Sequence, residues 1–140
     1  MSKFSQRSLD TLKGIHPSLV KVLTEAIKNT PVDFTLTNGV RTTKEQQELY
    51  AKGRTTKGPI VTKADGIKNK SNHQVKADGY GYAVDLYPFV NGSLDLNDKG
   101  DNLKVIAAHI LATAKCLGIK VEWGGSWKSI IDKPHFELKL

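Results

Sequence analysis

The sequence predicts an α+β domain with a small, mainly antiparallel sheet flanked by helices. Apolar residues recur at helical spacing in two long segments, and short apolar or alternating segments of strand character lie between and after them. Helices come first, and the strands that follow are separated by helices and long loops, an order that suits antiparallel pairing. The 140 residues fit a single domain, residues 1–140, which can bury a core without covalent cross-links.

The first 40 residues predict two helices and a strand. A short helical turn covers residues 6–12, and Pro17 begins a longer helix, because proline is favoured at the first helical position. One apolar stripe of that helix contains Leu19, Val20, Leu23, Ala26 and Ile27. Residues 32–39 then alternate polar and apolar side chains, with Phe34 and Leu36 on the apolar face. We expect the long helix to cover the sheet to which this half-buried strand belongs.

A third helix and a long loop follow this strand. Thr43 and Gln46 have the spacing of a capping box, and Gly53 ends the predicted helix. Residues 54–74 are polar and are interrupted by glycine and proline, which predicts a loop of unusual length. Few apolar residues would anchor this loop, so we expect it to form a mobile rim beside a functional site.

The second half predicts three more strands and a buried helix. The apolar run "YAVDLYP" is typical of a strand, closed by Pro88, and a turn-rich link leads to a helix over residues 103–117 that ends at Gly118. "IKVEW" resumes extended structure, and "GGSW" turns the chain. "PHFELKL" is the last strand, with apolar residues on one face and His135 and Glu137 on the other.

The composition limits the classes to which the protein can belong. A net charge of +7 favours an anionic partner, but the basic residues are spread along the chain without a recognition helix, so we expect no specific nucleic-acid binding. The single cysteine, Cys116, excludes an internal disulfide, and its apolar surroundings predict a buried thiol. Neither a signal-peptide core nor the ~20 apolar residues of a transmembrane segment is present, so we expect a soluble product of the cytoplasm.

Two polar residues occupy strand positions that call for an explanation. Asp85 lies within an apolar run, on the face of its strand opposite to the core residues. His135 has the same position on its own strand. An unpaired carboxylate among apolar neighbours either takes up a proton or binds a cation. If the two strands are neighbours, His73 from the preceding loop can reach the same point. Two imidazoles and one carboxylate, with a fourth position left to water, describe a catalytic zinc site.

A hydrolytic site also needs a general base next to the metal. Asp132 is the candidate, because it lies three residues before His135 and Pro134 stiffens the connection. Arg41 can place a positive charge beside an oxyanion or a substrate carboxylate. Each has a plainer interpretation, since Asp132 can cap a turn and Arg41 can be an ordinary surface charge. Trp127 either lines the site or packs against neighbouring residues.

Four motifs, in order, carry a resemblance to a known family. "SNH", "GYAVDLYP", "GGSW" and "DKPHFEL" resemble the zinc peptidases of the D-Ala-D-Ala carboxypeptidase and L-alanyl-D-glutamate endopeptidase family, whose phage members are endolysins, and the match extends back to Arg41. The resemblance implies these roles: His73, Asp85 and His135 as zinc ligands, Asp132 as catalytic base, Arg41 as the arginine facing substrate and oxyanion, and Ser71 as a polar group lining the substrate site.

The chain is longer between His73 and Asp85 than in many relatives. The insertion "QVKADGYG" contains Asp78, which competes with Asp85 for the role of ligand. Asp85 is favoured, because it lies on a strand and in the Gly-x-Ala-x-Asp frame of the family, neither of which holds for Asp78.

The resemblance implies a zinc-dependent peptidase that hydrolyses the stem peptide of peptidoglycan, with the L-Ala-D-Glu bond preferred and a D-Ala-D-Ala carboxypeptidase as the alternative. A non-catalytic cell-wall binding protein and a nucleic-acid-binding protein are the rivals from other classes. As an endolysin the protein is expected to be made in the host cytoplasm, to act as a monomer on the bacterial cell wall after release, and to be held there by the anionic envelope. Zinc is expected to order the rim through His73, its one fixed point. Five lysines of the rim and of the insertion are expected to face the substrate: Lys57, Lys63, Lys68, Lys70 and Lys76.

Overall fold

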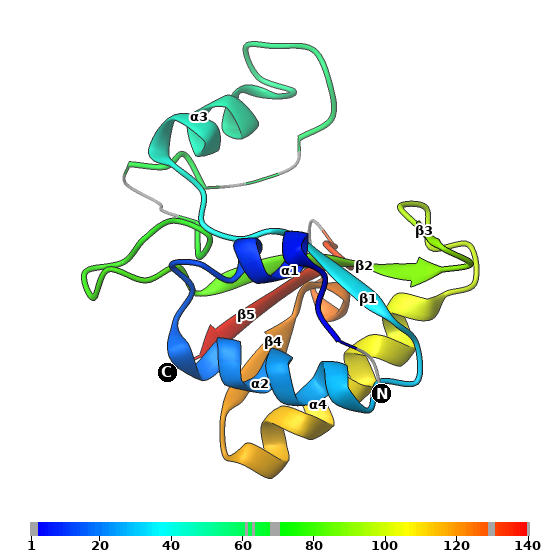
Figure 1. Ribbon diagram of the computed structural model, residues 1–140. Coiled ribbons are helices and arrows are strands. Elements are labelled where there is room, and N and C mark those ends of the chain that lie inside the picture. The colour runs from blue at the N-terminus through cyan, green and yellow to red at the C-terminus, as the bar shows by residue number, and fades with distance from the viewer. Residues whose placement is uncertain (1–2, 61, 63, 68–70, 129–130, 140) are drawn as a thin grey trace.

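The sheet is antiparallel throughout and has the strand order β1-β2-β5-β4, with the short β3 paired to β2. The computed structural model describes residues 3–60, 62, 64–67, 71–128 and 131–139 (Figure 1). The elements are α1 (Gln6–Thr11), α2 (Pro17–Lys28), β1 (Phe34–Asn38), α3 (Thr43–Ala51), β2 (Ala83–Val90), β3 (Ser93–Leu94), α4 (Asn102–Leu117), β4 (Lys120–Trp123), the 3-10 turn η1 (Gly124–Ser126) and β5 (His135–Lys139). The predicted α+β class is confirmed.

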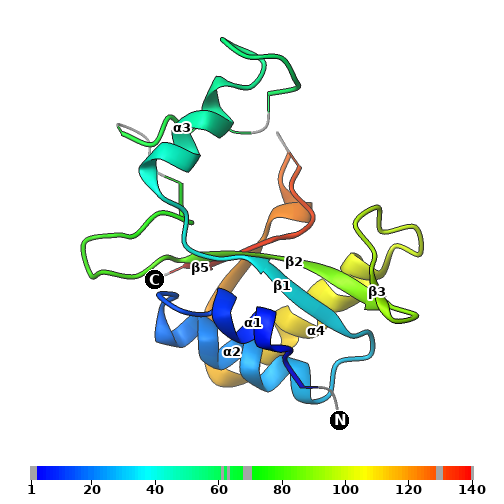
Figure 2. The same cartoon turned by 45° about the horizontal axis from the view of Figure 1, so that its top comes forward.

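The core lies between one face of the sheet and the two long helices, α2 and α4 (Figure 2). Each helix buries one apolar stripe, as its period of 3.6 residues requires. Both stripes and the sheet residues that meet them are almost fully buried: Leu19, Val22, Leu23, Ala26 and Ile27 from α2, Leu103, Ile106, Ala107, Ile110 and Ala114 from α4, and Leu36, Val84, Leu86, Phe136 and Leu138 from the strands. The opposite face of the sheet carries Asp85 and His135, and α3 lies on that side (Figure 2).

The short helix α1 covers the outer edge of the sheet. The hydroxyl of Ser8 accepts a hydrogen bond from the backbone N–H of Leu36 at 3.0 Å, and the hydroxyl of Thr11 donates one to the carbonyl of Leu36 at 3.1 Å. Side chains of α1 therefore satisfy backbone groups that an edge strand otherwise leaves open to another chain.

The strand β2 does not end at Pro88, as the sequence predicted, but continues to Val90. The amide of Phe89 donates to Asp33 on the side of β1, so the nitrogen of Pro88 points to the other side of the strand. On that side β5 pairs with β2 only as far as Asp85. The neighbour on that side is the short β3, which ends at Leu94, so only the carbonyl of Pro88 is used there, accepting from the amide of Asp95 at 2.8 Å, and the missing N–H interrupts no named strand.

Two other local predictions were wrong. The capping box of α3 uses Thr42 and Glu45 instead of Thr43 and Gln46, which leaves Gln46 free to turn inward. Cys116 is exposed, because the face of α4 that carries it points away from the sheet. Among the residues that the structure describes, no helix has the length and apolar character needed to cross a membrane.

Candidate metal centre and active site

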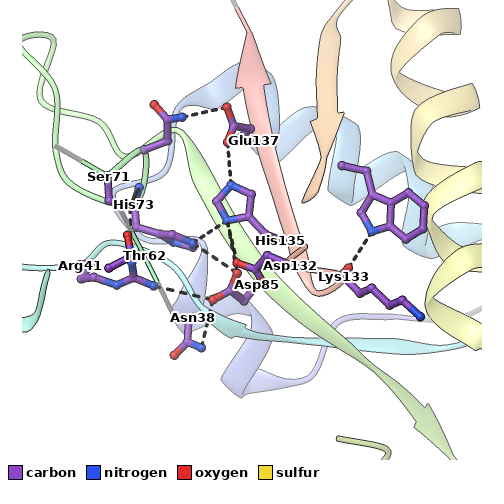
Figure 3. A network of polar contacts seen from close by, with 12 residues as sticks. Asn38, Arg41, Thr62, Ser71, His73, Asp85, Asp132, Lys133, His135 and Glu137 are labelled. Atoms are coloured by element: carbon purple, nitrogen blue, oxygen red, sulfur yellow. Dashed lines mark hydrogen bonds and ion pairs between the residues drawn. The ribbon is translucent and has the colours of Figure 1, made fainter. Parts of the chain in front are cut away.

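The three predicted ligands come together on the polar face of the sheet (Figure 3). Asp85 on β2 and His135 on β5 are direct cross-strand partners, and His73 reaches the same point from the loop before β2. The Nε2 atom of His73 lies 3.3 Å from Oδ1 of Asp85 and 3.1 Å from Nδ1 of His135, and the last two atoms are 3.6 Å apart. One atom from each residue thus faces a common centre.

Hydrogen bonds on the far side of each ring set the orientation of the two imidazoles. His73 donates from Nδ1 to the carbonyl of Gly39 at 2.9 Å, and His135 donates from Nε2 to Oε1 of Glu137 at 2.8 Å. Both acceptors are oxygens that carry no hydrogen, so the proton of each ring belongs on the nitrogen that faces them. The remaining nitrogen of each ring then presents a lone pair to the centre.

This arrangement fits a metal ion. Oδ1 of Asp85 is buried and has no hydrogen-bond partner in the described part of the protein, although a buried carboxylate oxygen normally has one. Three acceptor atoms that face one another repel unless a cation or a proton lies between them. Bonds of about 2.0–2.1 Å in a tetrahedral arrangement separate ligand atoms by roughly 3.3 Å, close to the distances found here.

The electrostatics of the group show the same demand for positive charge. Burial opposes ionisation of Asp85, but the two adjacent imidazoles outweigh it and hold the pKa of Asp85 well below its usual range. Burial lowers the pKa of His135, but the adjacent carboxylates of Asp85 and Glu137 outweigh it and raise the pKa to about 9. In the metal-free protein a proton on His135 therefore supplies the charge that a cation would bring.

Asp132 lies at the solvent-facing side of the centre. Its Oδ2 atom is 3.8 Å from Nδ1 of His135, and 42% of its side chain is exposed. Burial and the charge of Asp85 raise the pKa of Asp132, against the opposing effects of nearby cationic groups that include Arg41. A carboxylate with a raised pKa, open to solvent and next to the centre, can accept a proton from water.

Gly124, the first glycine of the "GGSW" turn, allows η1 to lie directly against the backbone of Asp132. Gly124 accepts a hydrogen bond from the amide of Asp132 at 3.1 Å. A Cβ atom on Gly124 would lie 2.3 Å from the carbonyl oxygen of Asp132 and 3.0 Å from Cβ of His135, which no side chain tolerates. The same turn places the ring of Trp127 with its centroid 4.8 Å from that of His135, half-buried beside the centre.

Arg41 lies on the other side of Asp85 and is held by two polar side chains. Its Nη1 atom donates to Oε1 of Gln46 at 2.7 Å and to the hydroxyl of Ser71 at 3.4 Å. Its Nη2 atom is 3.9 Å from Oδ2 of Asp85. The Ser71 hydroxyl also accepts from the amide of His73, so it organises both the arginine and the loop that carries a ligand.

The rim loop is fixed at more points than the sequence predicted. Gln46 is fully buried and donates to the carbonyl of Ala64 at 2.8 Å, and the buried Gln74 donates to the carbonyl of Gly66 at 3.1 Å. The expectation that His73 would be the only fixed point is therefore wrong. Among the lysines expected on the rim, the two described ones, Lys57 and Lys76, are exposed, while Lys63, Lys68 and Lys70 lie outside the described residues.

The insertion after His73 keeps Asp78 away from the centre. Asp78 is exposed and accepts hydrogen bonds from the hydroxyl of Tyr82 and the amide of Tyr80, which hold its pKa below the usual range. The carboxylate that faces the two histidines is that of Asp85.

Three buried or half-buried polar residues around the centre were not singled out from the sequence: Gln46, Asn72 and Glu137. Glu137 had one usable signal, since it lies two residues after His135 on the same strand face. Gln46 and Asn72 had none, because their partners are distant in sequence.

The fold is a two-layer α+β domain, and two histidines and one carboxylate on its polar sheet face form a group that could hold a metal ion. Residues 1–138 match the family model described as phage L-alanyl-D-glutamate peptidase. The chain belongs to this family. The resemblance drawn from the four motifs is confirmed.

Relatives with assigned activities span nearly the whole chain. The chain is 39% identical over 145 residues to the peptidoglycan L-alanyl-D-glutamate endopeptidase CwlK of Bacillus subtilis (strain 168), a match that covers 96% of this chain and 81% of CwlK. It is 33% identical over 138 residues to the L-alanyl-D-glutamate peptidase of Escherichia phage T5, covering 98% of this chain and 89% of that protein. Its structure is similar to the crystal structure of the Serratia marcescens L-Ala D-Glu endopeptidase ChiX, with a TM-score of 0.75, 31% identity, and coverage of 97% and 89% of the two chains.

Proposed function

We propose that the protein is a zinc-dependent peptidoglycan peptidase that hydrolyses the L-Ala-D-Glu bond of the stem peptide. The observation that carries the proposal is the convergence of three acceptor atoms, one of them the unpartnered Oδ1 of Asp85, beside the carboxylate of Asp132. Three N and O ligands with an open fourth position are typical of catalytic zinc. The bond is proposed from the two relatives and the solved structure, each of which is named for L-alanyl-D-glutamate cleavage.

His73 through Nε2, Asp85 through Oδ1 and His135 through Nδ1 would hold the ion. When bound, zinc polarises the scissile carbonyl and lowers the pKa of water from 15.7 toward ~7. Asp132 takes the proton of the attacking water, because its raised pKa brings it closer to the working pH, and then passes the proton to the leaving amine.

The remaining residues bind and orient the substrate. Arg41 keeps its guanidinium beside the centre through Gln46 and Ser71, so its charge can stabilise the oxyanion or a carboxylate of the stem peptide. Ser71, beside Arg41, and Trp127, beside His135, would line the substrate site. These roles suit a substrate that is rich in carboxylates.

We place the reaction at the bacterial cell wall, after synthesis in the host cytoplasm and release, and expect the protein to act as a monomer. The net charge of +7 favours retention by an anionic envelope. Zinc in the centre and the basic rim serve the same end, the capture of an anionic peptide next to the metal.

Digestion of purified sacculi tests the proposal. Mass spectrometry of the soluble fragments should show new stem peptides that begin with D-Glu, and Asp132→Asn should release none of them. Release of free D-Ala alone would instead identify a D-Ala-D-Ala carboxypeptidase. Binding to sacculi without any new terminus would identify a non-catalytic wall-binding protein.

A further inference from the structure

Next to His135, on the side away from Asp85 and His73, lies a buried carboxylate that the proposed reaction does not use (Figure 3). Glu137 is 3% exposed and lies on the same strand face as His135. Its Oε1 atom accepts from Nε2 of His135 at 2.8 Å. Its Oε2 atom accepts a hydrogen bond from the side-chain amide (Nδ2) of Asn72 at 2.8 Å and pairs with Nζ of Lys139 at 2.8 Å. A buried charge requires such partners, and here each of them connects to the centre or to the sheet.

The contact with His135 decides which ring nitrogen carries the proton. A proton on Nδ1 would leave two lone pairs, one on Nε2 and one on the carboxylate, facing each other at 2.8 Å. The carboxylate therefore selects the tautomer in which Nδ1 presents its lone pair toward Asp85 and His73. A neutral side chain at position 137 would select it more weakly, because a hydrogen bond to a charged acceptor is roughly twice as strong.

The contact with Asn72 joins the two histidine-bearing segments. Asn72 directly precedes His73 in the loop, while Glu137 belongs to β5, the strand of His135. The backbone adds to this connection, because the amide of Tyr82 donates to Asn72 and the amide of Leu138 donates to Tyr82, both at 2.7 Å. Glu137 thus fixes the distance between the loop and the strand that must both reach one ion.

We propose that Glu137 is a positioning residue for the metal: it holds His135 in the metal-binding tautomer and ties the loop of His73 to β5. Lys139, which also pairs with Glu122 at 3.0 Å, compensates the charge of Glu137. The inference rests on the proposed metal site and names a residue that sets its affinity. Partners that orient a metal-bound histidine typically account for 10–100-fold in metal affinity.

Zinc affinity of the purified full chain, measured by competition with a chromophoric chelator, tests this role. Glu137→Gln should weaken zinc binding by roughly 10–100-fold. The matched control is Glu122→Gln, which loses a contact with the same Lys139 but touches neither histidine. Its affinity should stay within about threefold of the unmodified protein, since a side chain that touches no metal ligand does not orient one. Equal affinity of the Glu137→Gln variant and the unmodified protein overturns the proposal.

A second measurement needs no variant. Long-range ¹H–¹⁵N NMR spectra of the zinc-loaded unmodified protein report the tautomer of each histidine, and His135 should carry its proton on Nε2. A proton on Nδ1 overturns the proposal even if Glu137→Gln fails to fold. Failure of the proposed cleavage can be told apart from failure of this inference. If zinc binds tightly, Glu137→Gln weakens its binding and sacculi are cut at another bond, the positioning role is supported and only the assigned bond is refuted. If the unmodified protein binds no zinc, both proposals fall.

Discussion

Removing the metal should make the stability of the protein depend on pH in a direction set by His135. Its pKa is raised from an ordinary 6.5 to about 9 in the folded, metal-free protein, because the carboxylates of Asp85 and Glu137 outweigh the effect of burial. A group whose pKa is higher in the folded state stabilises that state fully below its unfolded pKa. The stabilisation is lost as the pH rises through the folded pKa, so the free energy of unfolding should fall between pH 6.5 and pH 9.

The size of the effect follows from the shift in pKa. A rise from 6.5 to about 9 corresponds to a free energy on the order of 3 kcal/mol. That is a large part of the 5–15 kcal/mol by which a domain is usually stable. Zinc should abolish the dependence, because Nδ1 of His135 would then bind the ion and carry no proton at any pH in this range.

Urea unfolding of the chelator-stripped and the zinc-loaded protein at pH 6.5, 7.5 and 9 measures both curves. His135→Gln should flatten the curve of the stripped protein. His16→Asn is the matched control, because the ring of His16 packs against Tyr80 and Tyr82 and caps α2 by accepting from the amide of Ser18, a role that Asn also fills. A stripped protein whose unfolding free energy is constant or rises from pH 6.5 to pH 9 would refute the reasoning.

Three further predictions concern the residues around the centre. Asp132→Asn should keep stoichiometric zinc and lose turnover by roughly 10²–10⁴-fold, whereas His135→Ala loses the metal as well; equal zinc loss in atomic-absorption measurements would make Asp132 a ligand. Gln46→Leu should lower kcat/KM on a soluble stem peptide about tenfold at unchanged zinc content and cost about 1 kcal/mol in urea unfolding, because the half-buried carbonyl of Ala64 loses its donor; unchanged kinetics would mean that Arg41 does not need Gln46 to orient it. Replacing Lys57 and Lys76 by glutamine should slow lysis of sacculi, more at low salt, and leave hydrolysis of a soluble peptide nearly unchanged; an equal loss on both substrates would contradict a role in wall capture.

The strand periodicity carried the geometry of the site. Asp85 and His135 stand on the faces opposite the apolar residues of their strands, and a period of two residues places them on one side of a sheet. Antiparallel pairing then sets them directly opposite each other. His73 could be placed only by its motif, because a loop residue has no period to fix its direction.

The polar residues that hold the rim and the centre could not be predicted in this way. Gln46 and Asn72 look like ordinary surface residues of a helix and a loop, and their placement depends on hydrogen bonds to partners distant in the sequence. The prediction that Cys116 is buried was wrong for the opposite reason, because its neighbours in the sequence are apolar while its position on the helix faces outward. Local patterns predict which face of a helix or strand is apolar, but they do not predict which distant segments of the chain cover a given face.

The position of β5 determines when the centre can form. It follows every other strand in the sequence, yet it lies inside the sheet, between β2 and β4, and it carries His135. During synthesis β2 and β4 are made first but have no strand to join them, and the centre has only two of its three acceptors. We therefore expect activity only after residues 135–139 have left the ribosome. A chain interrupted before His135 loses the third acceptor, the central strand and Glu137 together, so we expect truncation there to abolish folding and metal binding in a single step.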